Sequence, residues 1–178
     1  MPDAFVTSLT GNFESSLRMM EAALRDVPDA LWETDLWPDA PTVPRADGGF
    51  NSSAPWFIAY HALTVLDYDL SGDFEPWRPP KPFDENVWSW PARVFTQREL
   101  LGYVDYCRGR VATTLTAFAP ERMLPASHRA GGSSYGTLVG GLPVHTTEHA
   151  AQIRQFLTGQ GVRVRPLPGD HGYRDDEA

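Results

Sequence analysis

The sequence of 178 residues contains one cysteine, an excess of acidic over basic side chains, and no long apolar run. Cys107 has no second thiol with which to form an internal disulfide, and a cysteine-based metal site is excluded for the same reason. No segment approaches the roughly 18 apolar residues of a membrane span. The N-terminus lacks the basic start and apolar stretch of a secretory signal peptide, so we expect a cytoplasmic protein with no membrane partner.

The charge balance disfavours nucleic acid as a partner. Fifteen Lys and Arg residues face 23 Asp and Glu residues, which gives a formal net charge of -8. A duplex would be repelled on balance, and no basic run along the chain offsets that repulsion. The length and the 42% of hydrophobic residues are instead typical of one globular domain with a substantial core.

Apolar residues at steps of three and four predict the first three helices. The first spans Phe5 to about Arg25, and the second spans Trp56 to about Leu70, with oxygens for an N-cap in residues 51–53 and Pro55 in the first turn. The third begins at the capping box of residues 96–99 (TQRE) and continues to Pro120. Cys107 lies in the apolar stripe of this third helix, where we expect a packed and unreactive thiol.

A fourth helix follows Ser133 or Ser134 and continues through Leu142 to about Gly159. Gly140, Gly141 and Pro143 disfavour its first half, which predicts a kink or a late start near Leu142. The stretches 30–49 and 72–95 are rich in Pro, Gly and Trp and are predicted to be long loops.

These elements predict an all-α protein, because no segment shows the alternating pattern of a strand. We expect a four-helix bundle with long loops after helices one and two. Residues 1–161 would form the bundle domain, and residues 162–178 an extended C-terminal tail of little energetic weight.

Three of the five histidines lie on predicted core-facing stripes: His61 on the second helix, and His145 and His149 on the fourth. Residues four apart on a helix lie about 6 Å apart along its axis and on nearly the same side, so His145 and His149 can bind one ion. Buried imidazoles without partners are costly, and a shared metal would compensate all three. Three imidazole ligands are typical of a zinc-like ion with one open coordination position.

The other histidines and the sequence motif around His145 are weaker candidates for a functional site. His128 and His171 lie in predicted loops and are not expected to be ligands. Residues 145–149 match H-x-x-E-H, the inverzincin metalloprotease pattern, but that family needs a further carboxylate ligand far downstream, and only 29 residues follow His149. Glu148 lies about 100° around the helix from His149, so it would either contact a metal ligand from behind or face solvent, and we expect the latter.

With these helices and histidines, the sequence resembles the DinB/YfiT-like metalloenzyme superfamily from Phe5 to about Gly161. The resemblance rests on PWFIAYHALTVLDYDL around His61 and on HTTEHAAQIRQFL from His145. Gln152-Ile153 is similar to the family's Gly-Gln-Ile step, with Ala151 in place of the glycine. The resemblance implies a divalent metal, zinc or nickel, held by His61, His145 and His149. It also implies a homodimer, and a hydrolase or a transferase that uses a low-molecular-weight thiol.

Two hypotheses follow. In the first, a metalloenzyme activates water or a thiol against a small-molecule substrate, with Trp56, Tyr60 and Thr64 as candidate pocket residues and no catalytic general base identified. In the second, a metal-free bundle serves as a binding or dimerisation module, and the aromatic segment 77–90 forms its partner surface. Metal content distinguishes the two.

Overall fold

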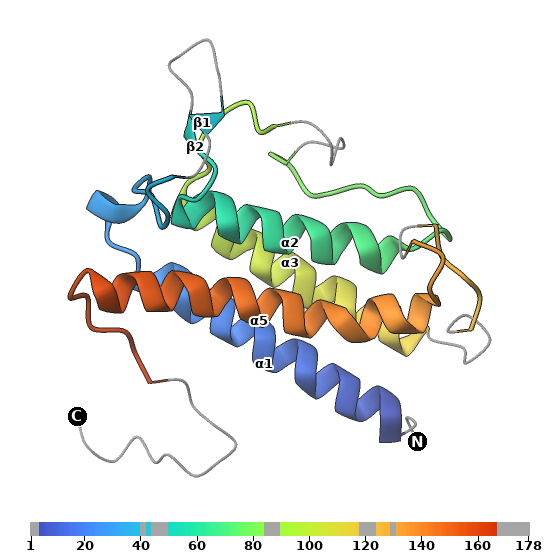
Figure 1. Ribbon diagram of the computed structural model, residues 1–178. Helices are drawn as coiled ribbons and strands as arrows, with labels where there is room; N and C mark the ends of the chain where they lie inside the picture. The colour runs from blue at the N-terminus through green and yellow to red at the C-terminus, as the bar shows by residue number, and fades with distance from the viewer. Residues whose placement is uncertain are drawn as a thin grey trace.

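The computed structural model describes residues 4–39, 42–43, 50–83, 90–117, 124–128 and 131–166, and four long helices form its framework (Figure 1). They are α1 (Ala4–Asp26), α2 (Pro55–Ser71), α3 (Gln97–Thr116) and α5 (Tyr135–Gly159). α1 and α2 each pack against both α3 and α5. The all-α four-helix bundle predicted from the sequence is confirmed.

The link between α2 and α3 returns along the bundle, so these two helices run in the same direction (Figure 1). The long loops expected after the first and second helices are therefore present. The loop after α1 contains a 3-10 turn, η1 (Asp29–Leu31), and two short strands, β1 (Thr42–Val43) and β2 (Phe50–Asn51). The strands pair antiparallel, with Thr42 opposite Asn51 and Val43 opposite Phe50. Strands of two residues carry no sequence periodicity, so this ladder was not predicted.

The N-caps predicted from the sequence are present at α3 and α5 but not at α2. The Thr96 hydroxyl accepts from the Glu99 backbone N–H at 3.2 Å, and the Glu99 carboxylate accepts from the Thr96 N–H at 2.8 Å, which confirms the capping box. Ser134 caps α5 through the Thr137 N–H at 3.1 Å. At α2 the predicted cap is wrong: the helix starts at Pro55 without a side-chain cap, and the Ser53 hydroxyl instead donates to Asp35 at 2.8 Å.

α5 also corrects the prediction of a late start near Leu142. It is a single helix from Tyr135 to Gly159, with Pro143 inside it. Proline removes one backbone donor and disfavours a helix interior. Leu142 and Pro143 are nevertheless both buried, so tertiary packing outweighs the local propensity.

The core draws side chains from all four helices and from the link before α3. Fully buried side chains include Leu17, Met20, Leu24, Leu63, Leu66, Leu100, Val104, Ile153 and Leu157. Phe83, in the link, stacks on Tyr103 of α3 with ring centroids 4.3 Å apart. Cys107 is buried as expected, and burial raises the pKa of its thiol well above the ordinary value.

The first residues after the bundle lie against it. Val162 and Val164 pack on the core, and the Arg165 backbone N–H and guanidinium donate to Asp26 at 2.9 and 2.7 Å. The tail was expected to be extended and of little energetic weight, and these residues make more contacts with the bundle than that. The domain boundary at residue 161 stays a prediction. None of the described helices has both the length and the apolar character needed to cross a bilayer.

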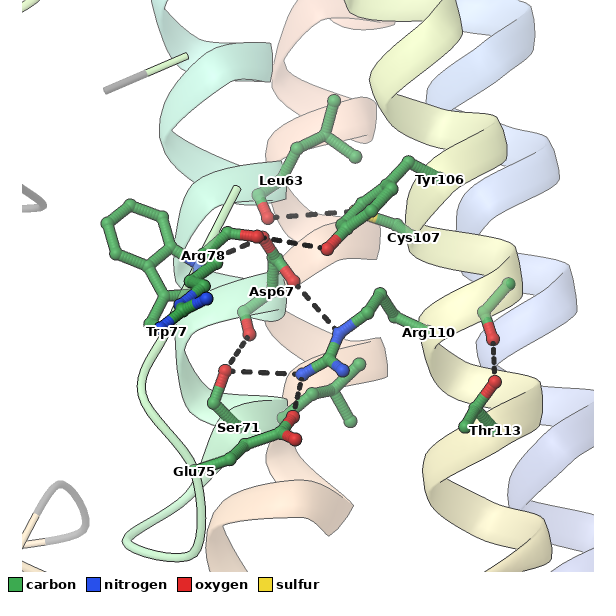
Figure 2. Close-up of polar contacts among 12 residues, drawn as sticks. Leu63, Asp67, Ser71, Glu75, Trp77, Arg78, Tyr106, Cys107, Arg110 and Thr113 are labelled. Carbon is green, nitrogen blue, oxygen red and sulfur yellow. Dashed lines mark hydrogen bonds and ion pairs between the residues drawn. The ribbon is translucent and has the colours of Figure 1, made fainter. Parts of the chain in front are cut away.

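A buried carboxylate joins α2 to α3 (Figure 2). Asp67 accepts hydrogen bonds from Trp77 Nε1 at 2.8 Å, from the Tyr103 hydroxyl at 3.1 Å and from Arg110 Nε at 3.3 Å. Arg110 also binds Glu75 at the surface. Burial raises the pKa of Asp67, and the three donors act in the opposite direction. The carboxylate therefore depends on its hydrogen bonds for stability.

We expect Asp67→Ala to lower the free energy of unfolding by about 3–5 kcal/mol, because it leaves the buried donors of Trp77 and Tyr103 without their acceptor and removes the buried partner of the half-buried Arg110. Glu75→Ala removes the exposed partner of the same Arg110 and should cost at most about 1 kcal/mol. Urea denaturation of both variants measures the difference. An equal decrease in the free energy of unfolding in both variants would show that the buried carboxylate stabilises the fold no more than the exposed one.

Candidate metal centre

The three predicted histidines come from α2 and α5 and form one cluster, and these two helices pack side by side (Figure 1). One potential ligand atom from each of His61, His145 and His149 lies within 4.8 Å of the other two. The ring centroid of His61 lies 5.4 Å from that of His145 and 5.1 Å from that of His149. The predicted convergence is therefore present, and the cluster can hold a metal ion.

The distance between the two histidines of α5 suits a shared ion. Their Nε2 atoms are 3.1 Å apart. Two nitrogens bound to one tetrahedral zinc ion at 2.0–2.1 Å lie about 3.3 Å apart. His61 would have to approach this pair to complete the site, since the largest separation in the cluster is 4.8 Å. A change of the His61 side-chain rotamer would accomplish such a shift, because this side chain is exposed.

The cluster lies nearer the surface than predicted. His61 is exposed, and His145 and His149 are half-buried, whereas all three were expected on core-facing stripes. The reason is visible on α5, where buried Thr146 and Ala150 each follow a histidine by one residue. The histidines thus lie at the edge of the buried stripe, and solvent can reach them.

The rings favour their neutral forms. His61 is exposed as a residue, but its ring is partly desolvated within the cluster, and this desolvation lowers its pKa to about 4, with His149 and then His145 as the smaller causes. The pKa of His145 is also lowered, chiefly by burial and then by His149, while Glu148 acts in the opposite direction. Neutral imidazole is the form that binds a metal ion. His61 and His145 are therefore in their ligating form at neutral pH.

Gln152 orients one ligand. Its side-chain oxygen lies 2.8 Å from Nδ1 of His149, so Nδ1–H donates to it and the lone pair of Nε2 points into the cluster. This is the usual second contact of a metal-binding histidine. In the sequence Gln152 contributed only to the family resemblance; its spacing of three residues from His149 is the pattern that predicts the contact.

His145 provides a further test of fit. Its Nδ1 atom is buried and has no hydrogen-bond partner among the described residues. A buried polar atom without a partner costs about 1–3 kcal/mol. An ion shared through the two Nε2 atoms would not reach this nitrogen, so Nδ1 needs a separate partner when the ion is bound. The donor set of three imidazoles, one of them incompletely satisfied, fits a zinc-like ion.

The remaining candidates lie elsewhere. His128 is exposed, away from the cluster, and its backbone N–H donates to Asp73 at 3.0 Å. His171 lies outside the described residues. Glu148 is exposed, as expected. Among the described residues no carboxylate joins the three histidines, which agrees with the rejection of the H-x-x-E-H protease pattern.

The predicted pocket residues do not line the cavity that includes His145. Trp56, Tyr60 and Thr64 are buried, and Tyr60 packs on Phe83 and Phe95 with centroids 6.1 and 5.1 Å away. The aromatic link between α2 and α3 covers this side of α2, which the helical spacing from His61 alone does not reveal. The cavity that does reach the cluster includes His145 and lies on the α5 side, with a volume of about 340 Å³.

Gln152→Leu should weaken metal binding by about 10–100-fold, because His149 loses the acceptor that fixes its tautomer and orientation. Titration of the metal-free protein with zinc, in competition with a chelating indicator, gives the dissociation constant. Gln155→Leu, a glutamine on the same helix one turn away, is the matched control and should change it less than twofold. Unchanged affinity in Gln152→Leu would contradict the orienting role.

The lowered histidine pKa values predict that the metal-free protein loses stability as the pH falls. Between pH 6.5 and about 4 the unfolded chain binds a proton at His61 that the folded chain does not, so the free energy of unfolding decreases in that window. Urea denaturation in EDTA at pH 7 and pH 5 measures the decrease. His61→Gln should reduce it; the same decrease in that variant would contradict the assignment.

Comparison of the chain with models of protein families, with curated proteins and with solved structures gives no match.

Proposed function

We propose that the protein is a metal-dependent enzyme of the DinB/YfiT-like type, in which His61, His145 and His149 hold one divalent ion, zinc or nickel. The observation that carries the proposal is the convergence of three imidazoles from two helices within 4.8 Å. Their order along the chain and their placement on the second and last helices agree with the resemblance in the sequence. This donor set supports two reaction types. One is hydrolysis of a small-molecule substrate by activated water, and the other is transfer of a low-molecular-weight thiol to such a substrate.

A catalytic role is favoured over a purely structural one by the number of ligands and their exposure. Structural zinc sites are closed by four protein ligands, whereas catalytic sites have three and leave a position open. This cluster has three, His61 is exposed, and a cavity includes His145. Substrate can therefore approach from the surface of the bundle without unfolding it.

A bound divalent ion lowers the pKa of a coordinating water or thiol and thereby supplies a nucleophile at neutral pH. The protein's own contribution is to favour the neutral forms of His61 and His145, because desolvation and the neighbouring rings lower the pKa of both. Neutral ligands leave the charge of the ion uncompensated, which favours an anionic nucleophile. Gln152 holds His149 in the required tautomer. No carboxylate joins the cluster within the described residues, so we assign no general base.

The partners of this proposal are a small-molecule substrate and a second copy of the chain in a homodimer. The net charge of -8 favours neither a nucleic acid nor an anionic membrane surface as a partner.

Metal content tests the proposal. Protein purified without a chelator or an affinity tag should contain close to one zinc or nickel ion per chain by inductively coupled plasma mass spectrometry. His61→Ala, His145→Ala and His149→Ala should each lose most of that metal, because two imidazoles bind far more weakly than three. His128→Ala removes an exposed histidine outside the cluster and should retain the metal.

The unfolding temperature is a second measurement that tests metal binding. Zinc at 100 times its dissociation constant stabilises the folded state by about 2.7 kcal/mol, which corresponds to an increase in unfolding temperature of about 5–10 °C for a protein of this size. Metal-free protein whose unfolding temperature does not respond to zinc or nickel would support a metal-free binding or dimerisation module instead. Where metal is found, a screen of thiol cofactors with electrophilic substrates separates transferase from hydrolase activity.

A further inference from the structure

A groove of about 340 Å³ runs between α2 and α5 beside the histidine cluster. Val65 of α2 and Leu138 and Leu142 of α5 contribute apolar walls, and His145 belongs to both the groove and the cluster. An engineered cavity of about 150 Å³ already holds benzene, and small-molecule sites begin near 300 Å³. The groove is therefore large enough for an aromatic ring with a short chain, in direct continuity with the candidate metal centre.

Gly141 keeps this groove open. It lies inside α5, where glycine lowers helix stability relative to alanine. A Cβ atom at position 141 would meet nothing within 4 Å, so helix packing does not require a glycine there. Position 141 lines the groove, however, and any larger side chain would extend into it. What distinguishes Gly141 from Gly140, whose added Cβ would also meet nothing within 4 Å, is its place in the groove lining.

We propose that this groove binds the apolar, uncharged part of the substrate while the reactive group of the substrate lies at the histidines, and that Gly141 determines which substrates fit. The role in catalysis rests on the proposed function; the binding itself does not require the metal. The geometry thus narrows the substrate class to small molecules with a neutral hydrophobic arm.

Charge and hydration exclude an anionic arm. Asp69 contributes a carboxylate to the lining, and the chain as a whole carries a net charge of -8. In the metal-free protein an ionised carboxylate would lose its hydration against the apolar walls, and no Lys or Arg lines the groove to pair with it. Ser133 and Thr137 offer hydroxyls to a neutral polar group. An alcohol or an ester therefore fits, and an acid does not.

Binding of two matched probes tests this inference on the full chain. Titration with 3-phenylpropanol, followed by ¹H–¹⁵N NMR, should shift the backbone amides of Val65, Leu138 and Leu142. 3-Phenylpropanoate has the same ring and chain length but carries a charge, and it should bind the metal-free protein at least tenfold more weakly. No shift of these amides at millimolar alcohol, or equal affinity for the acid, would overturn the proposal.

The neighbouring glycines provide a matched pair of variants. Gly141→Leu should weaken binding of the alcohol at least tenfold by filling the groove. Gly140→Leu changes an exposed glycine that does not line the groove and should leave the affinity within twofold. Both remove a helical glycine, so both should unfold a few degrees higher than the parent protein. Equal binding by Gly141→Leu and the parent would overturn the role of Gly141.

The same titrations with and without bound zinc separate this inference from the proposed function. Alcohol binding by a protein that takes up no metal would refute the metalloenzyme and leave the groove intact. Stoichiometric metal without alcohol binding would refute the groove alone. Metal content of Gly141→Leu should equal that of the parent, because the three histidines are unchanged.

Discussion

The packing of α2 against α5 is the contact on which the candidate site depends. His61 and the pair on α5 are far apart in the sequence, and only this interface brings their rings to centroid distances of 5.1–5.4 Å. Fully buried small residues, Ala62 on α2 and Ala150 on α5, allow such helices to approach closely. Packing and ligand geometry are thus coupled: whatever holds the two helices together also sets the separation of the imidazoles.

The two sides of α2 have different roles: one side carries a buried polar network, and the other carries a ligand of the candidate metal site. Toward α3 it presents Asp67, which is fully buried and accepts three hydrogen bonds. Toward α5 it presents His61, which is exposed and whose pKa is lowered to about 4. A satisfied polar network fixes one orientation of the helix, and a fixed helix holds its other face in place. The Asp67 network therefore positions α2, and with it His61, without contacting the histidines.

The sequence predicted what local spacing determines and missed what depends on the folded loops. The i, i+4 spacing of His145 and His149 and the capping box at Thr96 are local, and both are as expected. Exposure of the cluster is not local, because it depends on which side of α5 the other helices cover. Tyr60 was assigned to the pocket because it neighbours His61, but Phe83 and Phe95 from a distant segment pack on it.

The residues from Gly140 to His145 form the part of α5 that departs most from helix propensity, and the departures have different physical reasons. The Pro143 ring is buried and is stabilised by packing. Gly141 lines a groove that a side chain would fill, and His145 has a buried nitrogen without a partner among the described residues. Packing explains only the first of these. Local rules are broken without compensation mainly where a protein uses the space or the atom for function, and here the open groove and the incompletely satisfied ligand occur within one turn of a single helix.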